Sequence, residues 1–236
     1  MLQVAGWSII ERLICNPSLS TLNLQPETCN PQQLTMRYKY IAIEGNIGAG
    51  KTTLANLLAQ RLNATLLPEH FEDNPFLASF YENPDRHAFP LELSFLEERF
   101  RHVREAAAKD GVIVSDYLWE KSIVFARVNL SGNELRLFER IYAMMGGQLR
   151  VPDIVFYVHR PTGKLLQHIG KRGREYEKNI PQDYLAKIGA GYADYFASEK
   201  RMPVIWLDNQ LGPEALAQHV YSLLGKQFIN GLNMNP

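Results

Sequence analysis

The sequence YIAIEGNIGAGKTT at residues 40–53 joins a short apolar run to a glycine loop, and a helix-forming segment, Leu54–Leu62, follows at once. The loop matches G-x-x-x-x-G-K-T, the phosphate-binding P-loop. Its glycines let backbone N–H groups approach a polyphosphate closely, where a Cβ would obstruct them. An ordinary glycine turn is the alternative interpretation, but the apolar run before the motif and the helix after it favour the P-loop. We therefore predict a site for a nucleoside triphosphate.

Two side chains of this loop have predicted chemical roles. Lys51 reaches the terminal phosphates, and the hydroxyl of Thr52 binds Mg²⁺, which we expect as the cofactor alongside ATP. The positive end of the following helix adds to the anion site. The predicted ATP-binding residues are Gly45, Asn46, Ile47, Gly48, Ala49, Gly50, Lys51, Thr52 and Thr53.

Composition limits the possible partners. The 236 residues include 25 Lys plus Arg and 25 Asp plus Glu. The formal net charge is therefore zero and does not indicate binding to nucleic acid or to an acidic membrane surface. No apolar run approaches the roughly 20 residues of a membrane span. The two cysteines, Cys15 and Cys29, lack metal-ligand spacing, and so few cysteines favour a reducing cytoplasm.

The chain divides into three predicted parts. Residues 1–36 contain Pro17, Pro26 and Pro31 among scattered polar residues and are expected to be a poorly ordered extension or linker. Residues 37–228 form the P-loop domain, and 229–236 form a tail. The role of residues 1–36 cannot be predicted.

From residue 39 onward, short apolar runs alternate with longer segments of helical periodicity. We predict strands at 39–44, 65–68, 112–116, 153–158 and 203–208. Between them we predict helices at Leu54–Leu62, Leu91–Lys109, Asn133–Met145, Lys164–Lys171, Asp183–Lys200 and Pro213–Leu224. The alternation predicts an α/β fold, a P-loop NTPase three-layer sandwich with a five-stranded parallel sheet and helices on both faces.

Two carboxylates follow predicted strands and are expected to meet the P-loop in one cleft, because ligands bind at the carboxyl ends of parallel strands. Glu69 suits a general base that takes a proton from an attacking hydroxyl, or else is an exposed loop glutamate. Asp116 suits a second support for Mg²⁺, or else caps a helix.

A basic segment around Arg172 and Arg174 is interrupted by Gly170 and Gly173. Such a segment can close over a nucleotide and neutralise charge on the transferring phosphoryl group. A solvated helix end is the alternative. Aromatic residues between 76 and 99 suit a pocket for a flat base, although core packing explains them equally well.

Together these stretches resemble the deoxyribonucleoside kinases of the deoxycytidine, deoxyguanosine and deoxyadenosine kinase type, over Tyr38 to about Asp208. The resemblance is carried by the P-loop at residues 44–53, by Pro-Glu at 68–69 followed by Asn-Pro-Phe-Leu at 74–77, and by Arg-Gly-Arg-Glu-Tyr-Glu at 172–177. The Asn-Pro-Phe-Leu stretch looks most like the bacterial branch.

The resemblance implies roles at the reacting end of the substrate. Glu69 deprotonates the 5′-hydroxyl, and Arg172 and Arg174 are the lid arginines. With Lys51 they make up the implied catalytic residues. The family is commonly dimeric, so the resemblance also implies a homodimer.

The resemblance also implies roles toward the sugar and the base. Tyr81 and Glu177 hold the 3′-hydroxyl, and Phe125 stacks on the base. Glu92 and Arg99 occupy the positions whose side chains contact the edge of the base in members of the family.

One departure from the family pattern concerns the positively charged side chain that supports the 5′-oxygen. The family usually has Asp/Glu-Arg-Ser at the end of the third strand, whereas this chain has Ser115-Asp116-Tyr117. Asp116 can serve the metal, but the arginine is absent. We hypothesise that Lys121 supplies the missing positive charge.

A second departure concerns the base. Glu92 replaces the usual glutamine, and a carboxylate only accepts hydrogen bonds. Guanine offers two adjacent donors, which favours deoxyguanosine if Glu92 is ionised, whereas a protonated Glu92 suits adenine. The bacterial branch resemblance points to deoxyadenosine, so the choice of purine stays open.

The predicted reaction is transfer of the γ-phosphoryl group of ATP to the 5′-hydroxyl of a purine deoxynucleoside, an alcohol acceptor, in nucleotide salvage. One alternative is a nucleoside monophosphate kinase of the thymidylate type, which would need extra cations at the acceptor phosphate. Another is a nucleotide-dependent switch. A GTP-dependent switch should have the guanine-binding motif Asn-Lys-x-Asp, which this chain lacks.

Overall fold

The computed structural model describes residues 37–199 and 201–232, and the side chains among them up to residue 225. All of these residues belong to one compact unit, Pro31–Pro236. The predicted extension at 1–36 therefore lies outside the described residues. The predicted tail at 229–236 covers the last turn of the final helix and four residues beyond the described range.

The described chain alternates strands with helices. The strands are β1 (Tyr40–Gly45), β2 (Thr65–Leu67), β3 (Ile113–Ser115), β4 (Ile154–His159) and β5 (Val204–Asp208). The α-helices are α3 (Lys51–Leu62), α4 (Leu77–Glu82), α5 (Pro84–Ala107), α6 (Lys121–Asn129), α7 (Gly132–Gly146), α8 (Thr162–Arg172), α9 (Gln182–Ser198) and α10 (Pro213–Leu232). A single 3-10 turn, η2 (Glu175–Glu177), separates α8 from α9.

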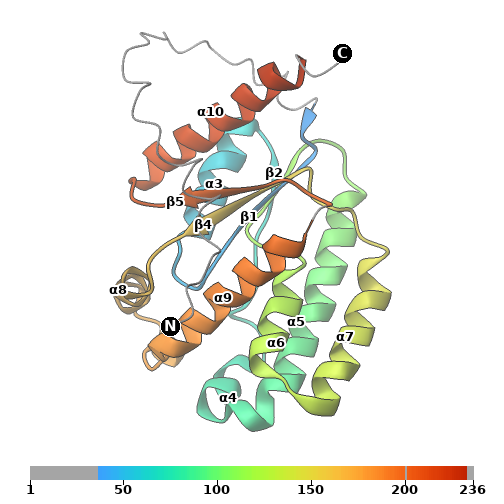
Figure 1. Cartoon of the computed structure of the whole chain (residues 1–236), viewed down its shortest axis with the longest axis vertical. Coiled ribbons are helices and arrows are strands. Elements are labelled where there is room, and N and C mark those ends of the chain that lie inside the picture. The colour runs from blue at the N-terminus through green and yellow to red at the C-terminus, as the bar shows by residue number, and fades with distance from the viewer. Residues whose placement is uncertain (1–36, 200, 233–236) are drawn as a thin grey trace, which may run out of the picture. The chain divides into compact units, whose positions relative to one another are not determined.

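All five strands run parallel, in the order β2-β3-β1-β4-β5. Helices α3 and α10 cover one face of the sheet, while α5, α6 and α9 lie across the other (Figure 1). The central strand β1 is buried along its whole length, as expected when both faces of a parallel sheet are covered. The predicted fold class is confirmed.

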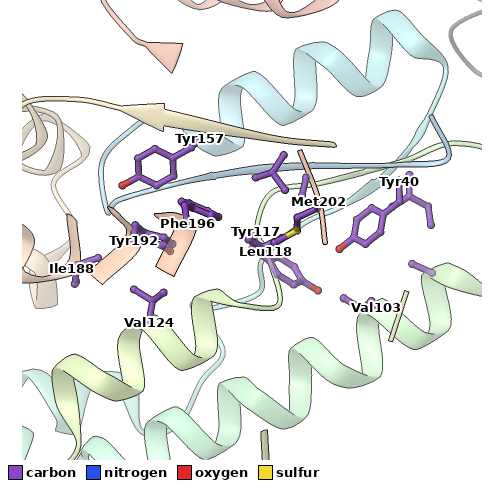
Figure 2. Packing of buried hydrophobic residues seen from close by; sticks show 14 residues of the cluster. Tyr40, Val103, Tyr117, Leu118, Val124, Tyr157, Ile188, Tyr192, Phe196 and Met202 are labelled. Atoms are coloured by element: carbon purple, nitrogen blue, oxygen red, sulfur yellow. The ribbon is translucent and has the colours of Figure 1, made fainter. Parts of the chain in front are cut away.

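The main core lies between the sheet and the helices α5, α6 and α9 (Figure 2). Aromatic rings dominate it: Tyr157 of β4 packs against Tyr192 and Phe196 of α9, with ring centroids 5.2 and 5.5 Å apart. A second buried cluster joins α4, α5, α6 and α7 around Phe95, Trp119 and Phe138. These two cores fix α5 and α6 beneath the carboxyl ends of β2 and β3, where the site forms.

Three segments differ from the sequence prediction. Residues 121–129 form the helix α6 and residues 77–82 form α4, and neither was predicted. Helix α5 begins at Pro84 rather than at residue 91, because Asn83 caps it by accepting a hydrogen bond from the Arg86 N–H and Pro84 occupies its first position. Pro90 therefore lies inside the helix instead of before it.

Two features hold the P-loop in place. A Cβ at Gly45 would lie 2.5 Å from the carbonyl oxygen of Val158, so only glycine fits between β1 and β4. The fully buried Glu44 accepts hydrogen bonds from the backbone N–H groups of Gly45 and Leu118, both at 2.8 Å. This carboxylate thus ties the end of β1 to the segment that follows β3.

We predict that Glu44→Gln lowers the free energy of unfolding by roughly 1–3 kcal/mol. Each carboxylate oxygen accepts one backbone N–H, but glutamine offers a single oxygen and turns an NH₂ group toward a donor. Denaturant unfolding measures the change. The exposed control Glu82→Gln should stay within about 0.5 kcal/mol of the wild type, and an equal loss in both variants would contradict this role of Glu44.

Candidate active site

One pocket extends from the P-loop to the helices α4, α5, α6 and α9. It is lined by residues of the P-loop, of the segment after β2, of these helices and of the segment after α8. All seven residues predicted to bind substrate line it: Glu69, Tyr81, Glu92, Arg99, Lys121, Phe125 and Glu177. The structure therefore brings together side chains that are far apart in the sequence.

Glu69 lies two residues beyond β2, between two cations. Its Oε1 accepts a hydrogen bond from Arg99 Nη2 at 2.9 Å, and its Oε2 lies 2.5 Å from Lys121 Nζ. Burial opposes ionisation of this carboxyl, but the charges of Lys121, Arg99 and Lys51 outweigh burial and lower its pKa to about 2. Glu69 is therefore ionised at any physiological pH.

Lys121 and Arg99 come to Glu69 from different helices. Lys121 is the first residue of α6 and has a side chain that is only 8% exposed. Arg99 belongs to α5 and also donates to Ser122 Oγ at 2.9 Å. The resemblance assigned Arg99 to the base edge, whereas its guanidinium contacts Glu69. A positive charge stands beside Glu69 although no arginine follows Asp116.

Asp116 directly follows β3 and is suited to a metal ion. It is buried, and its Oδ1 has no hydrogen-bond partner among the described residues. Burial raises its pKa to about 6, although the charge of Lys51 and a hydrogen bond from Thr52 favour the ionised form. An unsatisfied carboxylate oxygen beside the Thr52 hydroxyl fits the oxygen ligands that Mg²⁺ prefers.

The P-loop lysine and the two lid arginines are all close to oxygen acceptors. Lys51 Nζ donates to the carbonyl oxygens of Gly45 at 2.9 Å and Asn46 at 3.2 Å. Arg172 Nε donates to Glu177 Oε2 at 3.1 Å, and Arg174 Nη2 lies 2.6 Å from Glu72 Oε1.

A second pocket lies over the P-loop and is lined by basic side chains of α8 and of the segment that follows it. The two pockets share Gly48, Lys51, Thr52, Arg172 and Arg174. The pocket over the P-loop, where we predict the polyphosphate, and the pocket that contains Glu69 thus share the lysine and the arginines that the sequence singled out. A group bound in one pocket can reach a group bound in the other.

Glu92 of α5 lies in the part of the pocket beneath α6 and is 2% exposed. Its Oε1 accepts a hydrogen bond from Asn129 Nδ2 at 2.7 Å. Burial raises its pKa to about 7, while the hydrogen bond from Asn129 and the charges of Arg99 and Lys121 act in the opposite direction. Near neutral pH, Glu92 therefore exists in both protonation states.

Aromatic rings form the remaining walls of the pocket. Lys121 Nζ lies 5.3 Å from the ring centroid of Phe125, and Tyr81 stacks on Tyr176 with ring centroids 5.8 Å apart. Arg174 lies over the ring of Phe71, with 4.3 Å between the guanidinium carbon and the centroid. Flat rings around buried polar groups suit a planar ligand with a polar edge.

Several polar residues of the site were missed by sequence reasoning. Asn129 and Ser122 lie on the unpredicted helix α6, and Tyr184 comes from α9, far along the chain. Asn129 follows Phe125 by four residues, which is one helical turn, so the spacing would have revealed it once α6 was recognised. No local signal pointed to Tyr184.

Comparisons with known proteins identify the family to which the chain belongs. The family model described as "Deoxynucleoside kinase" matches residues 41–221. A deoxyguanosine kinase of Bacillus subtilis is 37% identical over 157 residues, which cover 65% of this chain and 76% of that protein. A deoxyadenosine kinase of Dictyostelium discoideum is 30% identical over 217 residues, which cover 86% of this chain and 87% of the relative.

Solved structures share the fold. The structure of a deoxyadenosine kinase from M. mycoides with bound dATP has a TM-score of 0.72 and 23% identity, and covers 78% of this chain and 98% of that one. The same enzyme with the products dCMP and dCDP gives a TM-score of 0.72 at 22% identity, over 79% and 99% of the two chains. Because the family model spans most of the sequence, the chain belongs to the deoxynucleoside kinase family and is an enzyme that phosphorylates deoxynucleosides.

Proposed function

We propose that this enzyme transfers the γ-phosphoryl group of ATP to the 5′-hydroxyl of a purine deoxynucleoside, in nucleotide salvage. The observation that carries the proposal is the ionised Glu69, held between Arg99 and Lys121 in a pocket that also contains Lys51. Relatives named as deoxyguanosine and deoxyadenosine kinases support a purine acceptor.

Glu69 accepts the proton of the 5′-hydroxyl in this proposal. A carboxylate with a pKa of about 2 is too weak a base to deprotonate a free alcohol. It instead orients the hydroxyl by a hydrogen bond and takes the proton once the 5′-oxygen has begun to bond to phosphorus. That order suits the loose transition state of phosphoryl transfer, in which bonding to the nucleophile lags behind departure of the leaving group.

Positive charge around the transferring phosphoryl group provides most of the remaining stabilisation of the transition state. Lys51 and the lid arginines Arg172 and Arg174 line both pockets, where they can neutralise the γ-phosphoryl oxygens. Thr52 and Asp116 would hold Mg²⁺, which supplies further charge neutralisation on the phosphates when bound. The protein contributes positioning and electrostatics rather than covalent chemistry.

The sugar and base are held on the other side of Glu69. We assign the 3′-hydroxyl to Tyr81 and Glu177, and stacking on the base to Phe125. Glu92 reads the base edge, because it is the buried carboxylate of the pocket that no cation pairs directly in the described part of the chain. Both purines remain candidates, since Glu92 can be ionised or neutral near pH 7.

We further propose that the enzyme acts in the cytoplasm as a homodimer and without nucleic acid. The small number of cysteines supports the cytoplasm, and the balanced charge supports action without nucleic acid. The dimer is what the resemblance to the family implies. None of the described helices combines the length and the apolar character that crossing a membrane demands.

We predict that Glu69→Gln lowers kcat by roughly 10²–10⁴-fold and leaves ATP binding nearly unchanged, because the amide cannot take the proton. Steady-state kinetics and calorimetric ATP titration measure the two quantities. Glu97→Gln, at an exposed carboxylate on α5, is the control and should retain wild-type turnover. Wild-type turnover by folded Glu69→Gln would move the base assignment elsewhere.

Lys121→Ala should lower kcat far more than it raises KM, as expected for loss of an interaction made mainly in the transition state. Its ammonium group lies against Glu69, where the attacking oxygen would sit. Lys187→Ala, which removes an exposed lysine on α9, is the matched control. If both variants have wild-type kinetics, Lys121 does not replace the absent arginine.

Competition among the four natural deoxynucleosides should favour the two purines, because Glu92 and the aromatic walls suit a purine edge and ring. Chromatography of the monophosphate products measures the preference.

ADP release should also depend on added deoxynucleoside, unlike in a switch or motor. A clear pyrimidine preference would overturn the purine assignment, and deoxynucleoside-independent hydrolysis would argue against the phosphotransfer mechanism.

A further inference from the structure

The buried carboxylate of Glu92 uses only one of its two oxygens within the protein. Oε1 accepts the hydrogen bond from Asn129, but Oε2 is buried and has no hydrogen-bond partner among the described residues. A buried oxygen without a partner costs free energy unless something satisfies it. Glu92 is one of the residues that line the pocket, so a ligand bound there can satisfy Oε2.

Asn129 is placed to control this carboxylate. It is the last residue of α6, one turn after Phe125, and both side chains line the pocket, as does Tyr184 of α9. Helices α5 and α6 lie side by side (Figure 1). The hydrogen bond from Asn129 to Glu92 joins the two helices. The hydroxyl of Tyr184 lies against the same amide.

We propose that Asn129 is a positioning residue that decides which oxygen of Glu92 reads the purine edge, and thereby sets the preference between guanine and adenine. This inference rests on the proposed purine deoxynucleoside specificity. Since the Asn129 N–H occupies Oε1, the proton of a neutral Glu92 is directed to Oε2. That oxygen is an acceptor when Glu92 is ionised and a donor when it is neutral.

The two states of Oε2 match different purines. An ionised Oε2 accepts from the guanine N1–H and 2-amino donors, and it would repel the lone pair of adenine N1. A protonated Oε2 donates to adenine N1, and it would face a donor on guanine. Leaving either mismatch buried costs enough to discriminate strongly.

The charged and titratable groups around Glu92 come from several elements. Arg99 on its own helix and Lys121 on α6 favour the ionised form, whereas Glu69 favours the neutral form. Tyr81 of α4 and Tyr184 of α9 also face it, and burial keeps both phenols neutral near pH 7. The hydrogen bond from Asn129 is the largest of the influences that oppose the effect of burial on the pKa of Glu92.

The test measures kcat/KM for deoxyguanosine and for deoxyadenosine across about pH 6 to about pH 8. In the wild type the ratio of the two should rise roughly 10- to 100-fold over this range as Glu92 loses its proton. Asn129→Leu removes the donor with little change in volume. The ratio near pH 7.5 should then fall about tenfold, and its rise should move to higher pH.

Three further variants make the result decisive. Glu92→Gln should give a ratio that does not change with pH. Asn129→Ala should behave like Asn129→Leu and serves if leucine disturbs folding. Asn133→Leu, at an exposed residue near the start of α7, should keep the wild-type profile.

The possible failures are distinguishable. A wild type that phosphorylates neither purine well contradicts the proposed function itself. A wild type that phosphorylates purines with a ratio that does not depend on pH, or Asn129 variants that fold and keep the wild-type profile, overturns only the inference about Asn129.

Discussion

The ion cluster at Glu69 is the interaction on which the site depends, because it joins three separate segments around one carboxylate. The end of β2 supplies Glu69, α5 supplies Arg99 and α6 supplies Lys121. A buried charge is stable only when it is paired, and removing one partner leaves the others uncompensated at a cost of several kcal/mol. The cluster therefore holds both helices against the end of β2, where we propose that the acceptor hydroxyl meets the phosphoryl group.

The same pocket contains a second carboxylate in the opposite electrostatic environment. Two cations contact Glu69 and lower its pKa to about 2, whereas an amide is the one hydrogen-bond partner of Glu92 in the described chain, and burial raises its pKa to about 7. Two carboxyl groups whose pKa values are driven apart have separate tasks. The permanently charged group suits the reacting end of the substrate, and the group that titrates near neutrality suits recognition of the base.

The sequence predicted the sheet and the P-loop because their signals are local, whereas most of the predicted pocket residues came from the resemblance to the kinase family. Val- and Ile-rich runs between turns identify strands, and the glycine spacing identifies the P-loop. Helix α6 was not predicted from the sequence because Lys121 and Ser122 are polar although they are buried, and this removes the amphipathic pattern of a helix. The start of α5 was predicted seven residues too late, at residue 91, although Asn83 and Pro84 carry a helix start signal. Partners such as Tyr184 depend on how α9 packs, which no short stretch encodes.

We propose that Lys121 supplies the positive charge that an arginine at the end of β3 would provide. An arginine there would directly follow Asp116, at position 117, but this chain has the buried Tyr117 at that position. The positive charge enters instead from the first turn of α6, on a flexible four-carbon side chain that ends in a compact ammonium group. Arg99 already supplies the planar, doubly donating contact between Glu69 and Ser122. In this proposal, phosphoryl transfer requires positive charge beside Glu69, whichever element supplies it. Side chains from the two helices α5 and α6 can provide this charge as well as an arginine at the end of a strand.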